Sequence, residues 1–491
     1  MFSLKSIVKS LLKIVPPVPQ QMTIYKEFDE QTDAFKNRLW YSGRAYELNQ
    51  FYRQTENNNY SFWGAVPTYG REVRKIHTGL PRLIVDTLTG IITADFNGIT
   101  IDDKPNSNMW EEIAAENSFD DIVEDAVRQT LVVGDGAFKL SLDDTVSQYP
   151  IIEFVPGDKM RIEYDRGRIK EIVFSKTYTR SSREYRLEET YGRGYVRYKL
   201  YRDDTELPLG TLAETAGLND VSYTGSFIMA VPLMFIKSSE RKGRGQSIFD
   251  GKTDNFDSFD EAYSQWMQAL RDCRPRTYIP ESLIPRNGAT GGLMRPNPFD
   301  NQFIKIGDDM SENAKNSVDI KQPSLPVEGY VQTYMAALDL CLQGIISPST
   351  LGIDTKKLDN AEAQREKEKT TLYTRQKIVT ALTKSLCILV QTVFDTYYTA
   401  QAQSLKEVKC SVNFGEYANP SFEAVVETLS NPNTPMSIES KVEEMWGSSK
   451  DDEWKAEEVQ RIKEQTGLVA ADEPSLGGAV SETVIGGFVN G

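Results

Sequence analysis

The sequence is poor in histidine and cysteine, and it contains no long uninterrupted apolar run. Its one histidine, His77, cannot form a metal site of several imidazoles, argues against a Ser-His-Asp triad, and is interpreted as a surface or packing residue. No segment is expected to be long and apolar enough to span a bilayer. The four cysteines form no CxxC pair and are interpreted as buried thiols of a reducing compartment: Cys273, Cys341, Cys387 and Cys410.

The length and charge of the chain limit what it can be. With 491 residues, the chain is long enough for about three domains and a substantial core. Its formal net charge of −15 excludes attraction of the whole chain to a polyanion. Any contact with DNA must therefore come from local basic groups or from surrounding the duplex.

The N-terminal segment Met1–Val15 is the one candidate for a targeting sequence. It has an apolar helical face, but Lys5, Lys9 and Lys13 interrupt the run that a signal peptide needs. Two interpretations stay open. The segment is either an arm that docks on protein, followed by a stiff linker at 16–19, or a helix that binds a membrane surface.

The first half of the chain predicts helices followed by an antiparallel sheet. The segment from Thr23 to about Asn108 is mainly helical, with a helix over 80–92 that begins near Pro81. A further amphipathic helix is expected over 110–133. From there to Lys237 the apolar period changes to two, which predicts strands.

Two long helices then enclose a small insertion. After a glycine-rich hinge at 242–247, large apolar residues follow at steps of seven, three, four, three and four, as in helices that pack side by side. Pro275 ends this pattern, and the segment to Pro326 predicts short strands at 276–279 and 302–306. The apolar seam consists of Phe249, Phe256, Phe259, Tyr263, Trp266 and Leu270.

The second half contains the strongest helical periodicity. Apolar residues repeat at helical steps over 327–345 and again over 372–397, on either side of a loop at 347–354. A helix from about 360 to 401 would be about 60 Å long, too long for one small core.

One strand is expected to return at 408–414, followed by acidic helices over 421–466. Ser437 is expected to cap the helix 438–446, and the chain beyond Ala470 is expected to be disordered.

No motif predicts catalysis, a metal or a cofactor. Gly251-Lys252-Thr253 looks like the end of a phosphate-binding loop, but Gln246 stands where that loop needs glycine, and no buried strand leads in. It is interpreted as a solvated Lys-Thr pair on a long helix. The carboxylates show no spacing that selects an acid or base, so the chain is not expected to be an enzyme.

The basic residues from Lys356 to Lys377 allow two interpretations. Glu362 with Arg365, three apart, is typical of a solvated helical face. Alternatively, Lys356 and Lys357 at the loop contact phosphates inside a channel. Arg286 and Arg295 in the insertion are equally ambiguous.

The order of parts and several short motifs resemble the portal proteins of tailed bacteriophages, in the branch of long-tailed phages of Gram-positive hosts. The motifs are GQS at 245–247, ISPSTLG at 346–352, NAEA at 360–363 and MSIE at 436–439. Each motif is degenerate alone, but the match, which rests mainly on the order of parts, covers most of the chain. The resemblance implies an α+β portal fold in which long helices accompany a mixed helix and antiparallel-sheet wing.

The resemblance also implies domain boundaries. These are a wing at 1–242, a first stem helix at 243–273, a clip at 274–325, a second stem helix at 326–346, a tunnel loop at 347–360, a long kinked helix at 361–404, a strand returning to the wing at 405–420, a crown at 421–470 and a flexible tail at 471–491.

Its functional implications are equally specific. Such proteins form a ring of twelve copies at one capsid vertex of the virion, assembled in the host cytoplasm with capsid and scaffold proteins. Double-stranded DNA passes through without sequence specificity, driven by the terminase large subunit, and later leaves through the same hole. By this resemblance, the tunnel loop contacts DNA through Lys356, Lys357 and Arg365, the clip contacts terminase and head-completion adaptor through Arg286, Arg295 and Phe299, and the apolar seam forms the ring interface.

Two rival hypotheses stay open. One is a nucleotide-driven DNA motor, which the missing phosphate-binding loop argues against. The other is a structural adaptor or scaffold oligomer of the virion that never touches DNA. An image of a ring with an axial hole would separate the conduit from both.

Overall fold

The computed structural model divides the chain into two compact units. Unit 1 comprises residues 1–357 and 365–417, and unit 2 comprises residues 358–364 and 418–491. The structure describes residues 30–55, 61–66, 73–286, 288, 291–292, 302–307, 317–353, 361–415, 437–446 and 452–465, without the side chains of 30, 302–303, 361–367, 444–446, 452–453 and 464–465. The expected N-terminal arm and C-terminal tail lie outside these residues.

Unit 1 begins with helices, as its periodicity predicts. Pro81 stands in the first turn of α4, where its missing N–H costs no hydrogen bond. The single helix expected over 110–133 is two helices, because Ser118 has φ 49° and Asn117 bonds the carbonyls of Ile113 and Pro150. The elements are α2 (Glu30–Ser42), α3 (Ala45–Thr55), α4 (Leu80–Ala94), β1 (Phe96–Ile101), α5 (Lys104–Glu116) and α6 (Phe119–Val133).

The antiparallel sheets expected up to Lys237 are confirmed, and they are two in number among the described residues. The first has the order β10–β2–β3, and the second has six strands in the order β4–β5–β6–β7–β8, with β9 also pairing with β7. Their strands are β2 (Asp135–Ser141), β3 (Ile151–Pro156), β4 (Met160–Asp165), β5 (Arg168–Arg180), β6 (Arg183–Gly192), β7 (Tyr195–Arg202), β8 (Thr205–Leu207), β9 (Val221–Ser222) and β10 (Ala230–Met234), with 3-10 turns η1 (Gly157–Lys159) and η2 (Leu209–Thr211).

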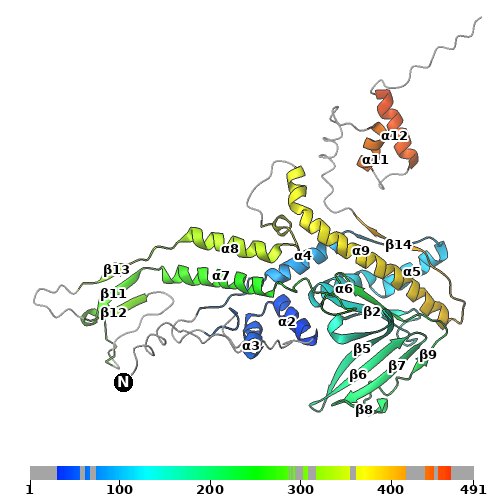
Figure 1. Cartoon of the computed structure of the whole chain (residues 1–491), viewed down its shortest axis with the longest axis horizontal. Helices are drawn as coiled ribbons and strands as arrows, with labels where there is room; N and C mark the ends of the chain where they lie inside the picture. The colour runs from blue at the N-terminus through cyan, green and yellow to red at the C-terminus, as the bar shows by residue number, and fades with distance from the viewer. Residues whose placement is uncertain are drawn as a thin grey trace, which may run out of the picture. The chain divides into compact units, whose positions relative to one another are not determined.

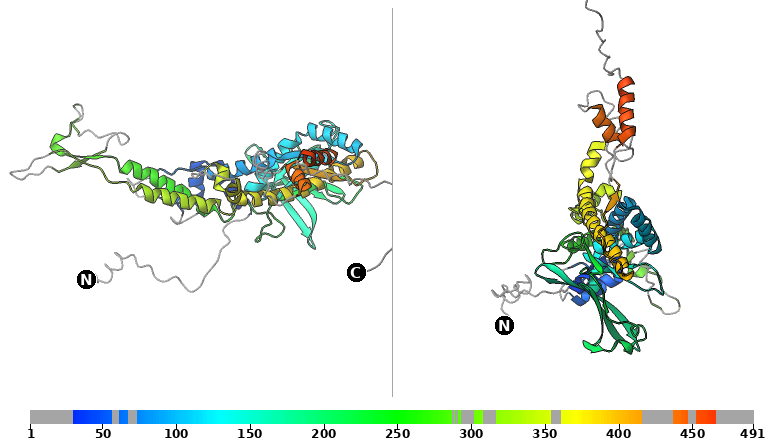
Figure 2. Two further views of the ribbon diagram at one scale, coloured as in Figure 1. Left: turned by 90° about the horizontal axis from the view of Figure 1, so that it is seen from above. Right: turned by 90° about the vertical axis from the view of Figure 1, so that its right-hand side faces the viewer.

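Two long helices and a small sheet follow the second antiparallel sheet. Helix α7 (Thr253–Asp272) packs against α8 (Val327–Leu342), and the two lie side by side in Figures 1 and 2. The first helix was expected from residue 243, but residues 243–252 form turns. Between the helices lie β11 (Arg276–Pro280), η3 (Glu281–Leu283), β12 (Gln302–Ile306) and β13 (Asp319–Lys321). In this sheet β11 pairs in parallel with β12 and antiparallel with β13.

The longest helix, α9 (Ala361–Ala400), follows the 3-10 turn η4 (Pro348–Leu351) and precedes β14 (Cys410–Phe414). The segment Glu368–Ala400 is long and apolar enough to cross a membrane by length and composition, so the expectation that no segment would be is wrong. Half of its most apolar window is buried within the chain. Leu382, Leu386 and Phe394 are fully buried there, which is how a core helix passes the same test.

One apolar core joins these elements. Its fully buried members include Leu88 of α4, Val127 of α6, Phe138 of β2 and Leu386 of α9. A smaller apolar cluster lies on the second sheet, around Leu187 of β6 and Leu200 of β7. The fold is therefore α+β, as predicted, with helices and antiparallel sheets sharing a core.

The part of unit 2 that the structure describes is helical. It contains α11 (Ile438–Trp446) and α12 (Asp452–Gln465), which pack on each other. The predicted cap is confirmed: the backbone N–H of Ser440 donates to Ser437 Oγ at 3.1 Å. A hydroxyl at this position satisfies a donor that the first turn leaves free.

The four cysteines are free thiols, as expected, but only Cys341 is fully buried, and the other three are half-buried. Of the two interpretations of His77, packing residue is confirmed and surface residue is wrong, since its side chain is 3% exposed. It belongs to a polar cluster described below.

A close approach of two glycine-containing turns fixes the start of the α7 segment, and it gives a first prediction. A Cβ built on Gly245 would lie 2.1 Å from the carbonyl oxygen of Gly134. Gly245→Ala is therefore expected to destabilise the protein by about 1–3 kcal/mol, the usual cost of overpacking. Chemical denaturation would measure it. Gly210→Ala is the matched control, because nothing lies within 4 Å of its Cβ position. Equal denaturation midpoints for the two variants would contradict the prediction.

Candidate functional site

Helix α7 has two functional stripes on neighbouring faces. The aromatic stripe consists of Phe256, Phe259, Tyr263 and Trp266, and the polar stripe consists of Asp257, Asp260 and Ser264. Both sets follow steps of three and four, so each occupies one side of the helix. Asp257, Asp260 and Ser264 are all buried, so α7 is enclosed on two sides rather than one.

The aromatic stripe packs within the chain, mainly on α8. Tyr334 lies 4.8 Å from Phe259, 6.2 Å from Tyr263 and 6.1 Å from Trp266, between ring centroids. The ring of Trp266 also stacks on that of Tyr330, with planes 6° apart. Contacts of this kind add about 0.5–1.5 kcal/mol each beyond burial. The stripe therefore joins α7 to α8.

This packing corrects the ring-interface prediction for most of the apolar seam. Phe249, Phe256 and Phe259 are at most 2% exposed in the single chain, so they have no surface left for a neighbouring copy. Tyr263 and Trp266 are half-buried against α8. Only Leu270, which is 44% exposed, keeps a surface of the predicted kind.

Asp257 in the polar stripe holds the segment 61–66. Its two carboxylate oxygens accept the backbone N–H groups of Phe62 at 2.7 Å and Trp63 at 3.0 Å. Lys75 closes the other side by donating to the carbonyl oxygens of Trp63 and Ala65 at 2.7 and 2.9 Å. The segment is thereby fastened between a helix carboxylate and a lysine.

Asp260 holds the segment 73–79 in the same way. It accepts four hydrogen bonds: from the indole Nε1 of Trp63 at 3.1 Å, from Thr78 N at 2.9 Å, from Thr78 Oγ1 at 2.8 Å, and from His77 Nδ1 at 2.7 Å. Ser264 continues the stripe by accepting the Ile76 N–H at 2.9 Å. Because Asp260 is 1% exposed, these bonds replace water that it has lost.

Burial moves two pKa values in this cluster toward neutrality. Desolvation raises the pKa of Asp257 to about 6, and the N–H groups of Phe62 and Trp63 partly oppose this. Desolvation lowers the pKa of Lys75 to about 8, reinforced by the charge of Arg53 and opposed by Asp257 and Glu261. Each charged group costs free energy here, and their attraction across the segment offsets part of it.

The loop that joins α8 to α9 is anchored before it leaves the described residues. Thr371 Oγ1 accepts the Ser347 N–H at 2.9 Å and lies 2.8 Å from Thr350 Oγ1. One turn later, the Arg375 guanidinium donates to Asp95 at 2.7 Å and to the Gly415 carbonyl at 2.6 Å. The described part of the loop, through Ile353, is thus tied to α9, and α9 is tied to the strand pair β1–β14.

The start of α7 is bonded to α8 by two side chains. Lys252 Nζ and Asn255 Nδ2 both donate to the Leu340 carbonyl of α8, at 2.9 and 3.1 Å. Lys252 therefore precedes α7 and bonds a backbone carbonyl, which corrects the interpretation of a solvated lysine on the helix.

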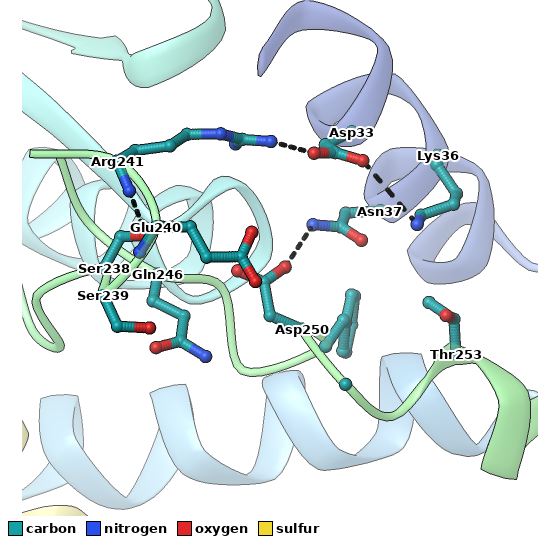
Figure 3. Close-up of a pocket in the computed structure, with 12 residues that line it drawn as sticks. Asp33, Lys36, Asn37, Ser238, Ser239, Glu240, Arg241, Gln246, Asp250 and Thr253 are labelled. Atoms are coloured by element: carbon teal, nitrogen blue, oxygen red, sulfur yellow. Dashed lines mark hydrogen bonds and ion pairs between the residues drawn. The ribbon is translucent and has the colours of Figure 1, made fainter. Parts of the chain in front are cut away.

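Figure 3 shows a polar pocket of about 290 Å³ between α2 and the turns before α7. In it, Arg241 pairs with Asp33, and Asn37 Nδ2 donates to Asp250 at 3.4 Å. Burial raises the pKa of Asp250. The pocket's charged groups are largely engaged with one another, so it braces α2 against the α7 segment.

Most of the remaining predicted site residues fall outside the part of the chain that the structure describes. Lys356, Lys357, Arg295 and Phe299 lie outside the described residues, and so does the side chain of Arg365. Arg286, which follows η3, is exposed. Among the described residues, no three His, Cys, Asp or Glu side chains could hold a metal ion.

Sequence reasoning missed the polar stripe. Its signal was present, because Asp257, Asp260 and Ser264 stand at steps of three and four directly beside the aromatic positions. What the sequence could not show was the partner segment 61–79, almost two hundred residues away. Without it, an acidic helix face is indistinguishable from a solvated one.

Helix α8 carries a second face that is free in the single chain. Gly329, Thr333, Ala336 and Leu340 follow steps of four, three and four, and all four are exposed. The Thr333 hydroxyl bonds the Gly329 carbonyl at 2.8 Å, which leaves its methyl group outward. We call these four residues the outer stripe of α8. It is small, apolar and smooth, as in closely packed helices.

No protein-family model matches the chain, and no curated protein matches it. Many solved chains are similar to it, including two from particle necks. One is a chain from the neck of a native GTA particle, computed with C12 symmetry, with 13% identity over 75% of this chain and 90% of that chain and a TM-score of 0.39. The other is from the neck of an empty GTA particle, computed with C6 symmetry, with 15% identity over 77% of this chain and 94% of that chain and a TM-score of 0.39.

Proposed function

We propose that this chain is a portal protein: a ring-forming conduit for double-stranded DNA at one vertex of a phage capsid. The observation that carries the proposal is the outer stripe of α8, beside an α7–α8 pair that is fully braced from within the chain. Because the α7–α8 pair has one apolar side without a partner among the described residues, this side can form a heterologous contact with a second copy of the chain. Repeated by rotation, such a contact closes into a ring.

The internal bracing supports this assignment of faces. The aromatic stripe and the polar stripe occupy two sides of α7, so the pair does not depend on a neighbour for its own stability. The interface then falls on α8, which is apolar on more than one side: Tyr334 faces α7, and Ala336 and Leu340 face outward. The apolar face of a helix is normally buried, so the outer stripe is expected to have a partner.

The charge of the chain suits a passage more than a binding site. Each phosphate that a protein neutralises adds about 0.9 to the salt slope of DNA binding, so many basic residues in every copy of a ring would hold DNA fast. A chain of net charge −15 with a few loop lysines offers weak, exchangeable contacts instead. In this proposal the energy for movement comes from a separate terminase motor, and the chain itself is not an enzyme.

The proposal extends to partners and place. The small sheet β11–β13 and its connections would meet the terminase large subunit and then the head-completion adaptor. The ring would assemble in the bacterial cytoplasm with capsid and scaffold proteins and remain in the virion. No cofactor is required for any of these contacts.

Ring formation gives a direct test. Ala336→Arg places a large cation in the centre of the outer stripe, which should prevent close helix packing and leave single copies or open fragments. Mass measurement and negative-stain imaging would read this, with rings and an axial hole expected for the parent protein. Val331→Arg is the matched control and should still form rings, because Val331 is exposed but lies five residues from Ala336 and so on a different side of α8. If the Ala336→Arg protein still formed rings, the outer stripe would not be part of the ring interface.

The DNA contact is tested separately. Particles carrying Lys356→Ala and Lys357→Ala together are expected to package or retain less DNA than the parent, because passing phosphates lose their exchangeable cations. Genome content per particle and the fraction that loses DNA on storage are the measurements. Lys384→Ala, an exposed lysine of α9 beyond the loop, serves as the control. Unchanged packaging and retention would refute the loop contact without refuting the ring.

Two alternatives predict different results. A structural adaptor or scaffold oligomer would form an assembly whose function is unaffected by both loop lysines. A nucleotide-driven motor would hydrolyse ATP as the purified chain, whereas the conduit is expected to show no turnover by itself. The imaging and an ATPase measurement therefore separate the three.

A further inference from the structure

Two of the free thiols lie against each other where α9 meets the strand β14. Cys387 is on α9, and Cys410 is the first residue of β14. The Cys387 thiol lies 3.8 Å from the carbonyl oxygen of Cys410, and the two thiol groups also interact directly. They come from segments 23 residues apart in the sequence, so their contact is made by the fold rather than by the local chain.

An independent contact fixes this approach one helical turn away. The side-chain amide of Gln391 donates from Nε2 to the Lys406 carbonyl at 3.0 Å, and its Oε1 accepts the Val408 N–H at 2.8 Å. This pair of bonds holds residues 406–408 against α9, and Cys410 follows two residues later. The thiols are thus placed by a clamp that does not involve sulfur.

The surroundings allow reagents to reach the pair and allow the strand end to adjust. Both cysteines are half-buried, and residues 401–407, which connect α9 to this strand, are all exposed. Burial, followed by the neighbouring Cys387 thiol and Asp102, raises the pKa of Cys410 to about 12. The Cys410 thiol therefore keeps its proton at neutral pH, so it is the slower of the two to start an exchange.

We propose that Cys387 and Cys410 are a redox pair that closes into an intramolecular disulfide when the protein meets a disulfide oxidant such as oxidised glutathione. The Cys387 thiolate attacks one sulfur of the oxidant, forming a mixed disulfide and releasing one glutathione. The Cys410 thiol then attacks the Cys387 sulfur and gives up its proton as the Cys387–Cys410 bond forms, and the second glutathione leaves and takes up that proton. The two cysteines lose two electrons in total, and their two protons end on the two reduced glutathiones.

The bond would staple α9 to β14. Among the described residues β14 has a single sheet partner, β1, and hydrogen bonds hold it to α9, from Gln391 before it and from Arg375 after it. A protein made in a reducing cytoplasm would carry both thiols, and the staple would form only on exposure to an oxidising medium. The inference holds whether or not the proposed portal function does.

The test uses the full-length protein, reduced and then incubated with oxidised glutathione. Thiol titration before and after denaturation, and mass spectrometry of unreduced peptides, are the measurements. The expected result is the loss of two of the four thiols, no retained glutathione at Cys387 or Cys410, and a peptide linking 387 to 410. Proteolysis within 401–409 should then yield fragments that stay joined until a reductant is added.

Variants separate the pair from other thiols. Cys273→Ser, which leaves the pair intact and is half-buried like it, should still lose two thiols. Cys410→Ser should instead retain one glutathione on Cys387, which also shows that this variant folds well enough to react. The inference is overturned if the parent protein keeps glutathione on Cys387 without closing the bond, or if both thiols survive while Cys273 is oxidised.

Discussion

Replacing Asp260 by alanine is expected to release the segment 73–79 from α7 and to destabilise the protein by about 3–5 kcal/mol, the range for a buried charge whose partners are left behind. The side chain is 1% exposed and accepts four hydrogen bonds, from Trp63, His77 and the two donors of Thr78. Alanine removes all four acceptor sites at once. Each buried donor left without a partner costs about 1–3 kcal/mol.

The measurement is urea denaturation combined with hydrogen exchange of the segments 61–66 and 73–79. Hydrogen exchange should become faster at the Thr78 N–H and at the Trp63 indole N–H, while exchange within α7 itself stays unchanged. Asp254→Ala is the matched control, since Asp254 is exposed in the first turn of the same helix and contributes only about 0.3–1 kcal/mol through the helix dipole. Equal midpoints for the two variants would show that the polar stripe does not hold the segment.

Asp260→Asn refines the same prediction. Asparagine keeps one carbonyl acceptor but turns the other position into a donor, which faces either the two donors of Thr78 or those of Trp63 and His77. An intermediate loss is therefore expected. If asparagine cost as much as alanine, the charge rather than the number of acceptors would dominate the site.

The sequence predicts best those elements whose signal is local and repeated. The helix expected from about 360 to 401 is α9 (Ala361–Ala400), and the strand expected at 302–306 coincides with β12. The Ser437 cap is likewise confirmed, because this cap depends only on the four consecutive residues 437–440. In these cases neighbouring positions carry the whole physical signal.

It predicts least well where distant segments decide the structure. The strand β1 was not expected, because its partner β14 lies more than three hundred residues later. The break between α5 and α6 depends on Asn117, whose side chain bonds the carbonyl of Pro150 and the N–H of Ile152. No helical periodicity over 110–133 contains that information.

The candidate site shows the same limit. Periodicity correctly found an apolar seam on α7, yet it could not say whether the seam meets α8 or a second chain. Tyr330 and Tyr334 of α8 cover it from within. The exposed stripe of α8 was hidden because Gly329, Thr333 and Ala336 are too small to register as an apolar face.

The second large effect is on pH dependence, through Asp257. Its pKa is 3.8 in an unfolded chain and about 6 here, mainly because burial disfavours the carboxylate. A pKa raised by folding contributes stability that is fully present below pH 3.8 and is lost as the pH rises through about 6. The difference corresponds to roughly 3 kcal/mol. Lys75 has the opposite sign: its contribution is present above pH 10.5 and is lost as the pH falls through about 8.

Both contributions are therefore absent between about pH 6 and pH 8, where both groups are charged. The free energy of unfolding should fall by up to about 3 kcal/mol between pH 4 and pH 7 through Asp257 alone. Asp257→Asn should flatten that part of the profile, because asparagine still accepts from one of Phe62 and Trp63 but does not ionise. Parallel profiles of urea denaturation for the parent and Asp257→Asn are the measurement, with Asp254→Asn, exposed on the same helix, as the control that should leave the slope unchanged. If the parent and Asp257→Asn profiles have the same slope between pH 4 and pH 7, the pKa of Asp257 is not raised. In that case the attraction of Lys75 stabilises the Asp257 carboxylate more strongly than burial destabilises it.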